Sequence, residues 1–318
     1  MKAITLKENG GIENFKLSEV DIPEIKDDEV LVKVKAVSIN PVDAFVRKNE
    51  SSLRGILKPG KDEDTFILGW DISGIVEKAG SKIKDFKEND KVFGMVNFPG
   101  NGKAYAEYVA APANQLALIP ANISFEEAAA ATLTALTAWQ ALVTHAGIKK
   151  GDKVLIHAAS GGVGHFAVQI AKYFGAHVIG TASSPNRDFV LALGADEFID
   201  YTSEKFEDKV NDADIVLDSV PGAEHLLRSI ESAKNGGSVI SIKSSFEGEL
   251  AEKANAKELK TYRILVSSNG NDMKHIAKLL EEGKIHPHIS RKYEFKDIPQ
   301  AHKQIETGKT LGKIVAVI

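Results

Sequence analysis

The pattern of hydrophobic and polar positions changes character near residue 124. Before that point, apolar residues alternate with polar ones over 30–37, and short apolar runs follow at 72–77 and 91–96. Alternation of this kind predicts β-strands with one buried face. The polar stretch 47–65 contains glycine and proline and predicts a mobile loop. The first 120 or so residues are therefore predicted to be rich in β-strands.

From Ser124 onward, strand-like and helix-like segments alternate. Ser124 and Glu127 have the spacing of a helix-capping pair, and the alanine-rich run 128–141 predicts a buried helix. The alternating segments are predicted at 153–158, 163–174, 177–181, 186–193, 197–200, 203–210, 214–218, 222–232 and 237–242, with a further strand near 262–266 and a helix at 272–282. This rhythm is typical of a parallel sheet with helices on both faces.

The expected fold class is α/β with two domains. After Gly283 the chain becomes β-like again and ends in the apolar run 313–318, which predicts that the tail rejoins the first domain. We therefore predict a β-rich domain formed by 1–123 and 285–318, and a doubly wound Rossmann domain formed by 124–284.

Composition excludes several classes of function. The net charge of −4 gives no electrostatic reason to expect nucleic acid or an anionic membrane as a partner. No apolar stretch is long enough to cross a bilayer, and residues 1–7 become charged too early for a signal peptide, so we expect a cytoplasmic protein. The chain has no cysteine, which excludes disulfides, thiol nucleophiles and cysteine-ligated metals.

A glycine-rich turn follows the predicted strand 153–158 and opens the predicted helix. It has the GxGxxG pattern with Ala159 at the first glycine position, and it contains Ser160, Gly161, Gly162, Val163 and Gly164. The lack of a Cβ at Gly161 lets a pyrophosphate approach the backbone, and Gly164 lets the helix pack closely on the strand. The helix N-terminus faces the anion. We predict a dinucleotide site here.

The residues after the second predicted strand favour NADP over NAD. An NAD-binding domain normally has Asp or Glu there, roughly 20 residues after the glycine turn, but no carboxylate occurs between 181 and 187. Ser183, Ser184 and Arg187 instead suit a 2′-phosphate, and Tyr201 adds a phenol donor. In the alternative interpretation Ser184, which precedes a proline, is an ordinary helix cap and Arg187 is a solvated helix residue.

Several segments, taken together, carry a family resemblance. They are Ser-Ile-Asn-Pro-Val-Asp at 38–43, Gly-Trp-Asp-Ile-Ser-Gly-Ile-Val at 69–76, Tyr-Ala-Glu-Tyr-Val at 105–109, Leu-Thr-Ala-Leu-Thr-Ala-Trp at 133–139, the glycine turn, and Leu-Gly-Ala-Asp at 193–196. In their order and spacing the chain resembles the zinc-independent quinone oxidoreductase branch of the medium-chain dehydrogenase/reductase superfamily. The resemblance covers essentially the whole chain. It implies a GroES-like catalytic domain, a Rossmann NADP-binding domain and a homodimer.

The zinc site of the superfamily's alcohol dehydrogenases has no counterpart here. That site uses Cys, His and an acidic residue around a Gly-His-Glu motif, whereas the corresponding stretch has Trp70 in place of the His. Without a Lewis acid, the expected reaction is hydride transfer from NADPH to an already conjugated acceptor, a quinone. An enone or alkenal C=C reductase, a non-catalytic NADPH-binding sensor, and an alcohol dehydrogenase with a rebuilt metal site remain the alternatives.

The resemblance also implies which residues lie at the reacting centre. It places Asn40 beside the nicotinamide and substrate, although Asn before a proline is also a common turn residue. Asp43 is either a catalytic acid or a loop-capping carboxylate, and Trp70 either stacks on the acceptor or packs in the core. Phe45 stands where relatives often have Tyr, so a phenol donor is lost.

The remaining cofactor contacts are implied at strand ends and in the tail. Thr137 is expected near the nicotinamide, with a hydrogen bond inside its own helix as the alternative. The crossings after later strands are expected to line the cofactor, because an open α/β sheet binds ligands at the carboxyl ends of its strands. These contacts are Ser219, Val220, Ile242, Val266, Leu311, Gly312 and Lys313.

Overall fold

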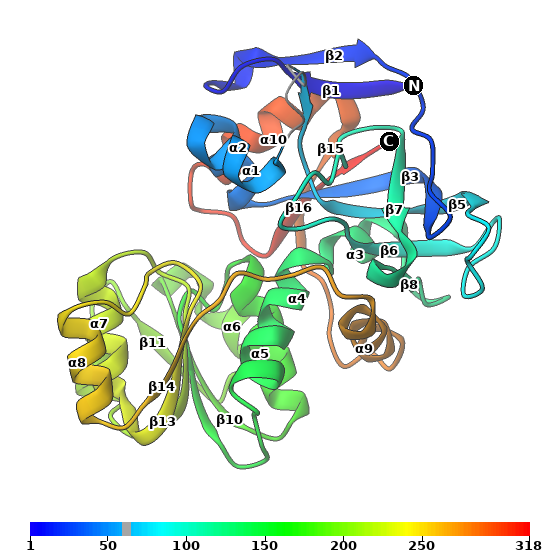
Figure 1. The fold of residues 1–318 in the computed structure, drawn as a ribbon. Helices are drawn as coiled ribbons and strands as arrows, with labels where there is room; N and C mark the ends of the chain where they lie inside the picture. The colour runs from blue at the N-terminus through cyan, green and yellow to red at the C-terminus, as the bar shows by residue number, and fades with distance from the viewer. Residues whose placement is uncertain (59–64) are drawn as a thin grey trace. The chain divides into compact units, whose positions relative to one another are not determined.

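The computed structural model describes residues 1–58 and 65–318, which form two compact units (Figure 1). Unit 1 comprises Met1–Leu136 and Val266–Ile318, and unit 2 comprises Thr137–Leu265. This division differs from the predicted boundaries at 124 and 285. Residues 124–136 and 266–284 belong to unit 1 because the helices they carry, α3 (Phe125–Ala130) and α9 (Gly270–Glu281), pack on its strands.

Unit 1 is built on a seven-stranded sheet with the order β15-β16-β3-β5-β6-β8, and β7 pairs with β3. A smaller sheet has the order β2-β1-β4. The strands are β1 (Lys2–Leu6), β2 (Phe15–Glu19), β3 (Glu29–Ile39), β4 (Phe66–Ile67), β5 (Asp71–Ala79), β6 (Lys91–Met95), β7 (Tyr108–Pro112), β8 (Ala117–Leu118), β15 (Ile289–Glu294) and β16 (Lys313–Val317). The C-terminal β16 pairs antiparallel with β3, which confirms that the tail rejoins the first part of the chain.

The predicted loop 47–65 is wrong for most of the residues that the structure describes. Helix α1 (Pro41–Lys48) ends inside it and α2 (Glu50–Leu57) lies within it, while residues 59–64 lie outside the described residues. Leu53 and Leu57 are buried at helical spacing, so a short amphipathic pattern outweighs the polar composition of the stretch.

Unit 2 is a six-stranded parallel sheet with the order β11-β10-β9-β12-β13-β14, which confirms the predicted Rossmann fold. The strands are β9 (Lys153–Ile156), β10 (His177–Ala182), β11 (Glu197–Asp200), β12 (Ala213–Asp218), β13 (Ala233–Ser241) and β14 (Lys260–Arg263). Helices α5 (Gly162–Tyr173) and α6 (Arg187–Ala192) cover one face, and α7 (Ala223–Ser232) and α8 (Glu249–Ala256) cover the other (Figure 1). The strand order reverses between β9 and β12, where such sheets bind ligands.

Two helix predictions need correction. The predicted helix 203–210 is a series of turns with one short 3₁₀ turn at Phe206–Asp208, because only Phe206 and Val210 of this polar segment have core partners. The alanine-rich run is buried as predicted but is not one helix. It divides into α3 (Phe125–Ala130), α4 (Leu133–Trp139) and a wider turn in which Ala146 N donates to Ala141 O.

The remaining helices lie in the C-terminal part of unit 1. They are α9 (Gly270–Glu281) and α10 (Ile298–Ile305). Within residues 1–58 and 65–318, no helix combines the length and apolar character that a membrane span requires.

Candidate active site

The glycine turn joins β9 to α5 in a tight conformation. Ala158 has a φ of +50°, in the left-handed region that favours glycine. A Cβ added to Gly164 would lie 2.2 Å from the carbonyl oxygen of Ala158, so only glycine lets the helix approach the strand this closely. The packing role predicted for Gly164 is therefore confirmed. At Gly161 an added Cβ would meet only Ala158 O, at 3.3 Å, so the turn is less crowded there.

The N-terminus of α5 has the donors that a phosphate requires. Gly161 is the N-cap residue, and no side chain caps the helix. The first N–H groups of a helix have no intrahelical partner, and they carry the positive end of the helix dipole. Residues 160–163 are also partly exposed. The predicted pyrophosphate contacts at 160–164 therefore fit a dinucleotide at this turn.

Hydroxyl and guanidinium groups gather at the carboxyl end of β10. Ser183 is half-buried, whereas Ser184 and Arg187 are exposed. The Arg187 guanidinium lies 5.3 Å from the centre of the Phe198 ring, a cation–π contact that restrains the side chain. Tyr201 is 58% exposed at the end of the neighbouring strand β11. The residues predicted for a 2′-phosphate are thus brought to the same sheet edge as the glycine turn.

Two further residues of this cluster, Asn186 and Asp200, were not predicted from the sequence pattern. Asn186 donates from Nδ2 to Ser160 Oγ (3.1 Å) and to Ser183 Oγ (3.4 Å). Asp200 lies opposite Ala182 in the parallel register, so the acid that β10 lacks is present one strand away. The hydrogen bonds from Thr202 hold the pKa of Asp200 below its usual value, and the carboxylate is therefore charged.

A buried polar network supports the glycine turn. His157 Nδ1 lies 3.1 Å from Thr181 Oγ1, and His157 Nε2 lies 3.1 Å from Ser229 Oγ. Ser229 Oγ donates to Asp218 Oδ2 (2.8 Å), so Nε2 of His157 carries the hydrogen and Nδ1 accepts. Burial lowers the pKa of His157 to about 3, which keeps the ring neutral. The network ties together the ends of β9, β10 and β12 and helix α7.

The predicted contacts at later strand ends of unit 2 have bonds within the fold. Ser219 Oγ donates to His157 O (2.9 Å), and Val220 N donates to Asp218 Oδ1 (2.9 Å). Ile242 N donates to Asp218 O (3.0 Å). Ser219, Val220 and Ile242 remain partly exposed, so their outer surfaces line the sheet edge while these bonds fix their backbones.

In unit 1, Asn40 lies at the start of α1 with no exposed surface. Its Nδ2 donates to Asp71 Oδ2 (2.7 Å), and its Oδ1 accepts from the Lys313 ammonium. Lys313 also donates to Ile39 O (3.4 Å) and is 2% exposed. Both ends of the Asn40 amide are therefore occupied by buried partners. The Lys313 ammonium, predicted to lie beside the cofactor, points into this network with Asn40.

Asp43 is held by the same network. Its Oδ2 accepts from Asn40 N (2.8 Å) and from Tyr105 OH (2.8 Å), and the Tyr105 oxygen lies 3.0 Å from His302 Nε2. Burial, with a smaller contribution from the charge of Asp71, raises the pKa of Asp43 to about 7. Its bond from the backbone N–H of the N-cap residue Asn40 is the carboxylate half of a capping box. The geometry favours the capping alternative over a catalytic acid.

Trp70 is a core residue of unit 1. Its side chain has no exposed surface, its Nε1 donates to Gly100 O (2.7 Å), and its ring packs edge-on against Phe98 with centroids 5.0 Å apart. The packing alternative is therefore favoured over stacking on an acceptor. Phe45, by contrast, is 55% exposed on α1.

The other predicted cofactor contacts vary in exposure. Thr137 and Val266 are buried, whereas Leu311 is half-buried. Gly312 has a φ of +55°, and an added Cβ would lie 2.3 Å from His288 O, so glycine is required there by the backbone itself. The predicted site residues are divided between the two units.

The described residues contain no group of three or more His, Cys, Asp or Glu side chains placed to hold a metal ion.

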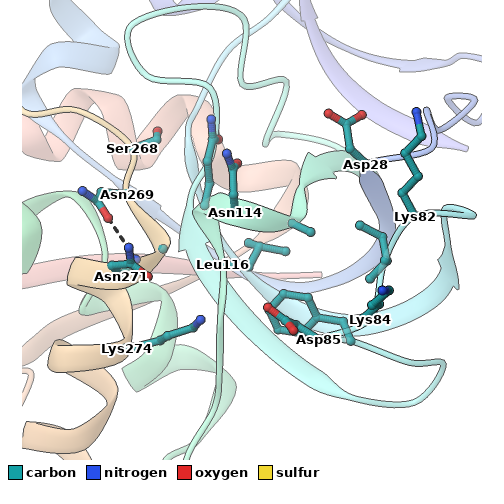
Figure 2. A pocket seen from close by; sticks show the side chains of 15 residues that line it. Asp28, Lys82, Lys84, Asp85, Asn114, Leu116, Ser268, Asn269, Asn271 and Lys274 are labelled. Atoms are coloured by element: carbon teal, nitrogen blue, oxygen red, sulfur yellow. Dashed lines mark hydrogen bonds between the residues drawn. The ribbon is translucent and has the colours of Figure 1, made fainter.

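Unit 1 contains a cavity of about 710 Å³ beside the N-terminus of α9 (Figure 2). Asn269 Oδ1 already accepts from the backbone of Asn271 (2.9 Å) and Asp272 (3.1 Å). Lysine and aspartate side chains both line the cavity, so it selects no sign of charge.

Comparison with known proteins identifies the two parts of the chain. Residues 26–121 match the model of the alcohol dehydrogenase GroES-like domain, and residues 193–316 match the model of a zinc-binding dehydrogenase domain. A 2-methylene-furan-3-one reductase of Solanum lycopersicum is 36% identical and is matched over 99% of this chain and 78% of its own length. A chloroplastic NADPH-dependent alkenal/one oxidoreductase of Arabidopsis thaliana is 34% identical, over 99% and 79%. The solved quinone oxidoreductase of Coxiella burnetii is 36% identical, covers 100% of this chain and 99% of its own, and superposes with a TM-score of 0.91.

Proposed function

Because the chain belongs to the quinone oxidoreductase-like branch of the medium-chain dehydrogenase/reductase superfamily, we propose that it reduces a quinone with NADPH. Membership makes the chain an enzyme of the oxidoreductase type.

One observation carries the choice of cofactor. The uncapped N-terminus of α5 and the donor cluster of Ser183, Ser184 and Arg187 lie at the same edge of the sheet. The first supplies backbone N–H groups for a pyrophosphate, and the second supplies hydroxyl and guanidinium donors for a 2′-phosphate. The end of β10, where NAD-binding domains have their acid, is occupied by Ala182.

NADPH, when bound, supplies a hydride from C4 of its nicotinamide. The protein contributes binding and orientation. The α5 N-terminus and the glycine turn hold the phosphates, while the buried bonds of His157, Asp218 and Ser229 fix the strand ends beneath them. In unit 1, Phe45 presents an exposed aromatic surface on α1 without a phenol donor. The reduced acceptor therefore takes its proton from solvent in this proposal.

A conjugated enone or alkenal is the second candidate acceptor. The names of the Solanum and Arabidopsis relatives describe reduction of such substrates, and both relatives match 99% of this chain. Hydride transfer to a conjugated carbon requires the same cofactor site as hydride transfer to a quinone. The two candidates can therefore be distinguished only by which acceptor the enzyme reduces.

The test is a panel of acceptors with purified protein and NADPH. NADPH oxidation is followed by the loss of its near-ultraviolet absorbance with benzoquinone, an ortho-quinone and a straight-chain alkenal, each with and without a metal chelator. We expect the highest kcat/KM with a quinone and no effect of the chelator. Preference for the alkenal would move the assignment to the second candidate. Absence of oxidation with every acceptor would contradict reductase function.

A further inference from the structure

The side chain of Asn186 makes hydrogen bonds that are unusual for a helix N-cap residue. Asn186 is the N-cap residue of α6, where Asn normally accepts a hydrogen bond from the first turn of the helix. Its side chain makes no such bond. Nδ2 instead reaches the glycine turn, 26 residues earlier in the chain, and bonds Ser160 Oγ at 3.1 Å and Ser183 Oγ at 3.4 Å. The side chain thus links two segments rather than capping its own helix.

The direction of these bonds determines what the two serines can do. Each hydroxyl has one hydrogen to donate and two lone pairs that accept. Because the Asn186 amide occupies a lone pair of each oxygen, both hydroxyl hydrogens remain for another acceptor. Among residues 1–58 and 65–318, neither Ser160 nor Ser183 donates its hydroxyl hydrogen to a protein group. Polarisation by the amide also strengthens each hydroxyl as a donor.

The surroundings favour an anion as the missing acceptor. Ser160 lies in the glycine turn at the N-terminus of α5, Ser183 directly follows β10, and the exposed Arg187 begins α6. A phosphate accepts several charge-assisted hydrogen bonds at once, whereas a ribose hydroxyl does not. The charged Asp200 on β11 repels any anion bound here. The affinity for a phosphate therefore depends on how many hydrogen-bond donors point at that phosphate.

We propose that Asn186 is a positioning residue that aims the Ser160 and Ser183 hydroxyls at the phosphates of the cofactor and thereby sets the preference for NADPH over NADH. This inference rests on the proposed function. It predicts that the identity of residue 186 matters more for a ligand with a 2′-phosphate than for one without it.

The critical variant is Asn186→Asp, which keeps the shape of the side chain. Its carboxylate accepts from both hydroxyls, so their hydrogens turn inward, and it adds a negative charge. Asn186→Ala removes the link without adding charge. Asn211→Asp is the matched control, because this exposed residue precedes β12 and lies at the opposite, amino-terminal edge of the same sheet.

The measurement is the Kd, by calorimetry, for NADPH, NADH and adenosine 2′,5′-bisphosphate, a probe that needs no turnover. We expect Asn186→Asp to weaken both 2′-phosphate ligands by about tenfold, the effect of one lost charge-assisted hydrogen bond, with a smaller change for NADH. Asn186→Ala should weaken the same ligands by about threefold, and Asn211→Asp should leave all three unchanged.

Equal loss of NADPH and NADH, or no loss in either Asn186 variant, would show that Asn186 is only a turn residue. Failure of the parent protein to bind either 2′-phosphate ligand more tightly than NADH would instead overturn the cofactor assigned in the proposed function. The two failures are therefore distinguishable, since the second is seen in the parent and the first only in the variants.

Discussion

At the scale of single residues, Asp43 shows how burial changes a carboxyl group. Asp43 has no exposed surface, and its Oδ1 has no hydrogen-bond partner among the described residues. The charge of the buried Asp71 makes ionisation of Asp43 still less favourable. Its pKa of about 7 in the folded state lies above the ordinary value near ~4. The folded state therefore holds a proton on Asp43 that the unfolded state releases.

This shift predicts a pH dependence of stability. Between about pH 4 and pH 7 the folded state binds more protons at Asp43, so its contribution to the free energy of unfolding falls as the pH rises. Asn cannot titrate. We therefore expect Asp43→Asn to lose less stability than the parent between about pH 5 and pH 8, as measured by thermal midpoints. Asp85→Asn, a change at an exposed loop carboxyl, is the control. Parallel pH curves for the parent and Asp43→Asn would contradict this account.

At the scale of elements, helix α7 carries two buried serines with different partners. Ser229 bonds Asp218 and lies 3.1 Å from His157, which connects the helix to β9 and β12. Ser232 Oγ donates to Arg228 O within the helix itself (3.0 Å). The two residues are matched in type, burial and helix, and they differ in whether they join separate elements.

Replacing each serine by alanine should therefore have unequal effects. Ser229→Ala leaves the buried Nε2–H of His157 without its acceptor, an expected cost of about 1–3 kcal/mol in the free energy of unfolding. Ser232→Ala removes a local bond and should cost less than about 1 kcal/mol. Urea denaturation of the two variants measures both values. Similar costs would mean that the network does not stabilise the strand ends.

At the scale of the whole molecule, the two units have different buried titratable groups. Burial lowers the pKa of His157 in unit 2 and of His302 in unit 1 to about 3. Each neutral histidine stabilises its unit above about pH 6.5, and that contribution is lost as the pH falls toward 3. In unit 1 the raised pKa values of Asp43 and Asp71 act in the opposite direction, because protonation stabilises these buried carboxyls.

Acidification should therefore destabilise unit 2 more than unit 1. In unit 2, burial raises the pKa of Asp218, but the hydrogen bond from His225 and the nearby His157 lower it below its usual value, so this carboxylate adds to the acid sensitivity only below about pH 5. Hydrogen exchange at about pH 7 and pH 5, corrected for the intrinsic rates, gives opening free energies for β9 and β12 against β3 and β16. We expect the larger decrease in β9 and β12. A larger decrease in β3 and β16 would contradict the assignment.

Local sequence patterns predicted the elements of unit 2 well because each pattern is contained in its own segment. Strand β11 matches the predicted 197–200, and α5 begins one residue before the predicted 163. The failures have an equally local cause. Helix α2 was not predicted because its segment is polar in composition. The segment 203–210 has helical spacing at Phe206 and Val210, but it has too little apolar surface to stabilise a helix.

The glycine turn, the lack of cysteine and the absence of an acid at the end of β10 can be read directly from the chain, because each depends only on which residue occupies a position. The partners of buried polar groups follow only from the folded arrangement. It brought Lys313 to Asn40, Tyr105 to Asp43, and Asn186 to Ser160. Those contacts join residues far apart in the chain, and a buried polar group must find its partner wherever the fold places one. No local pattern encodes that choice.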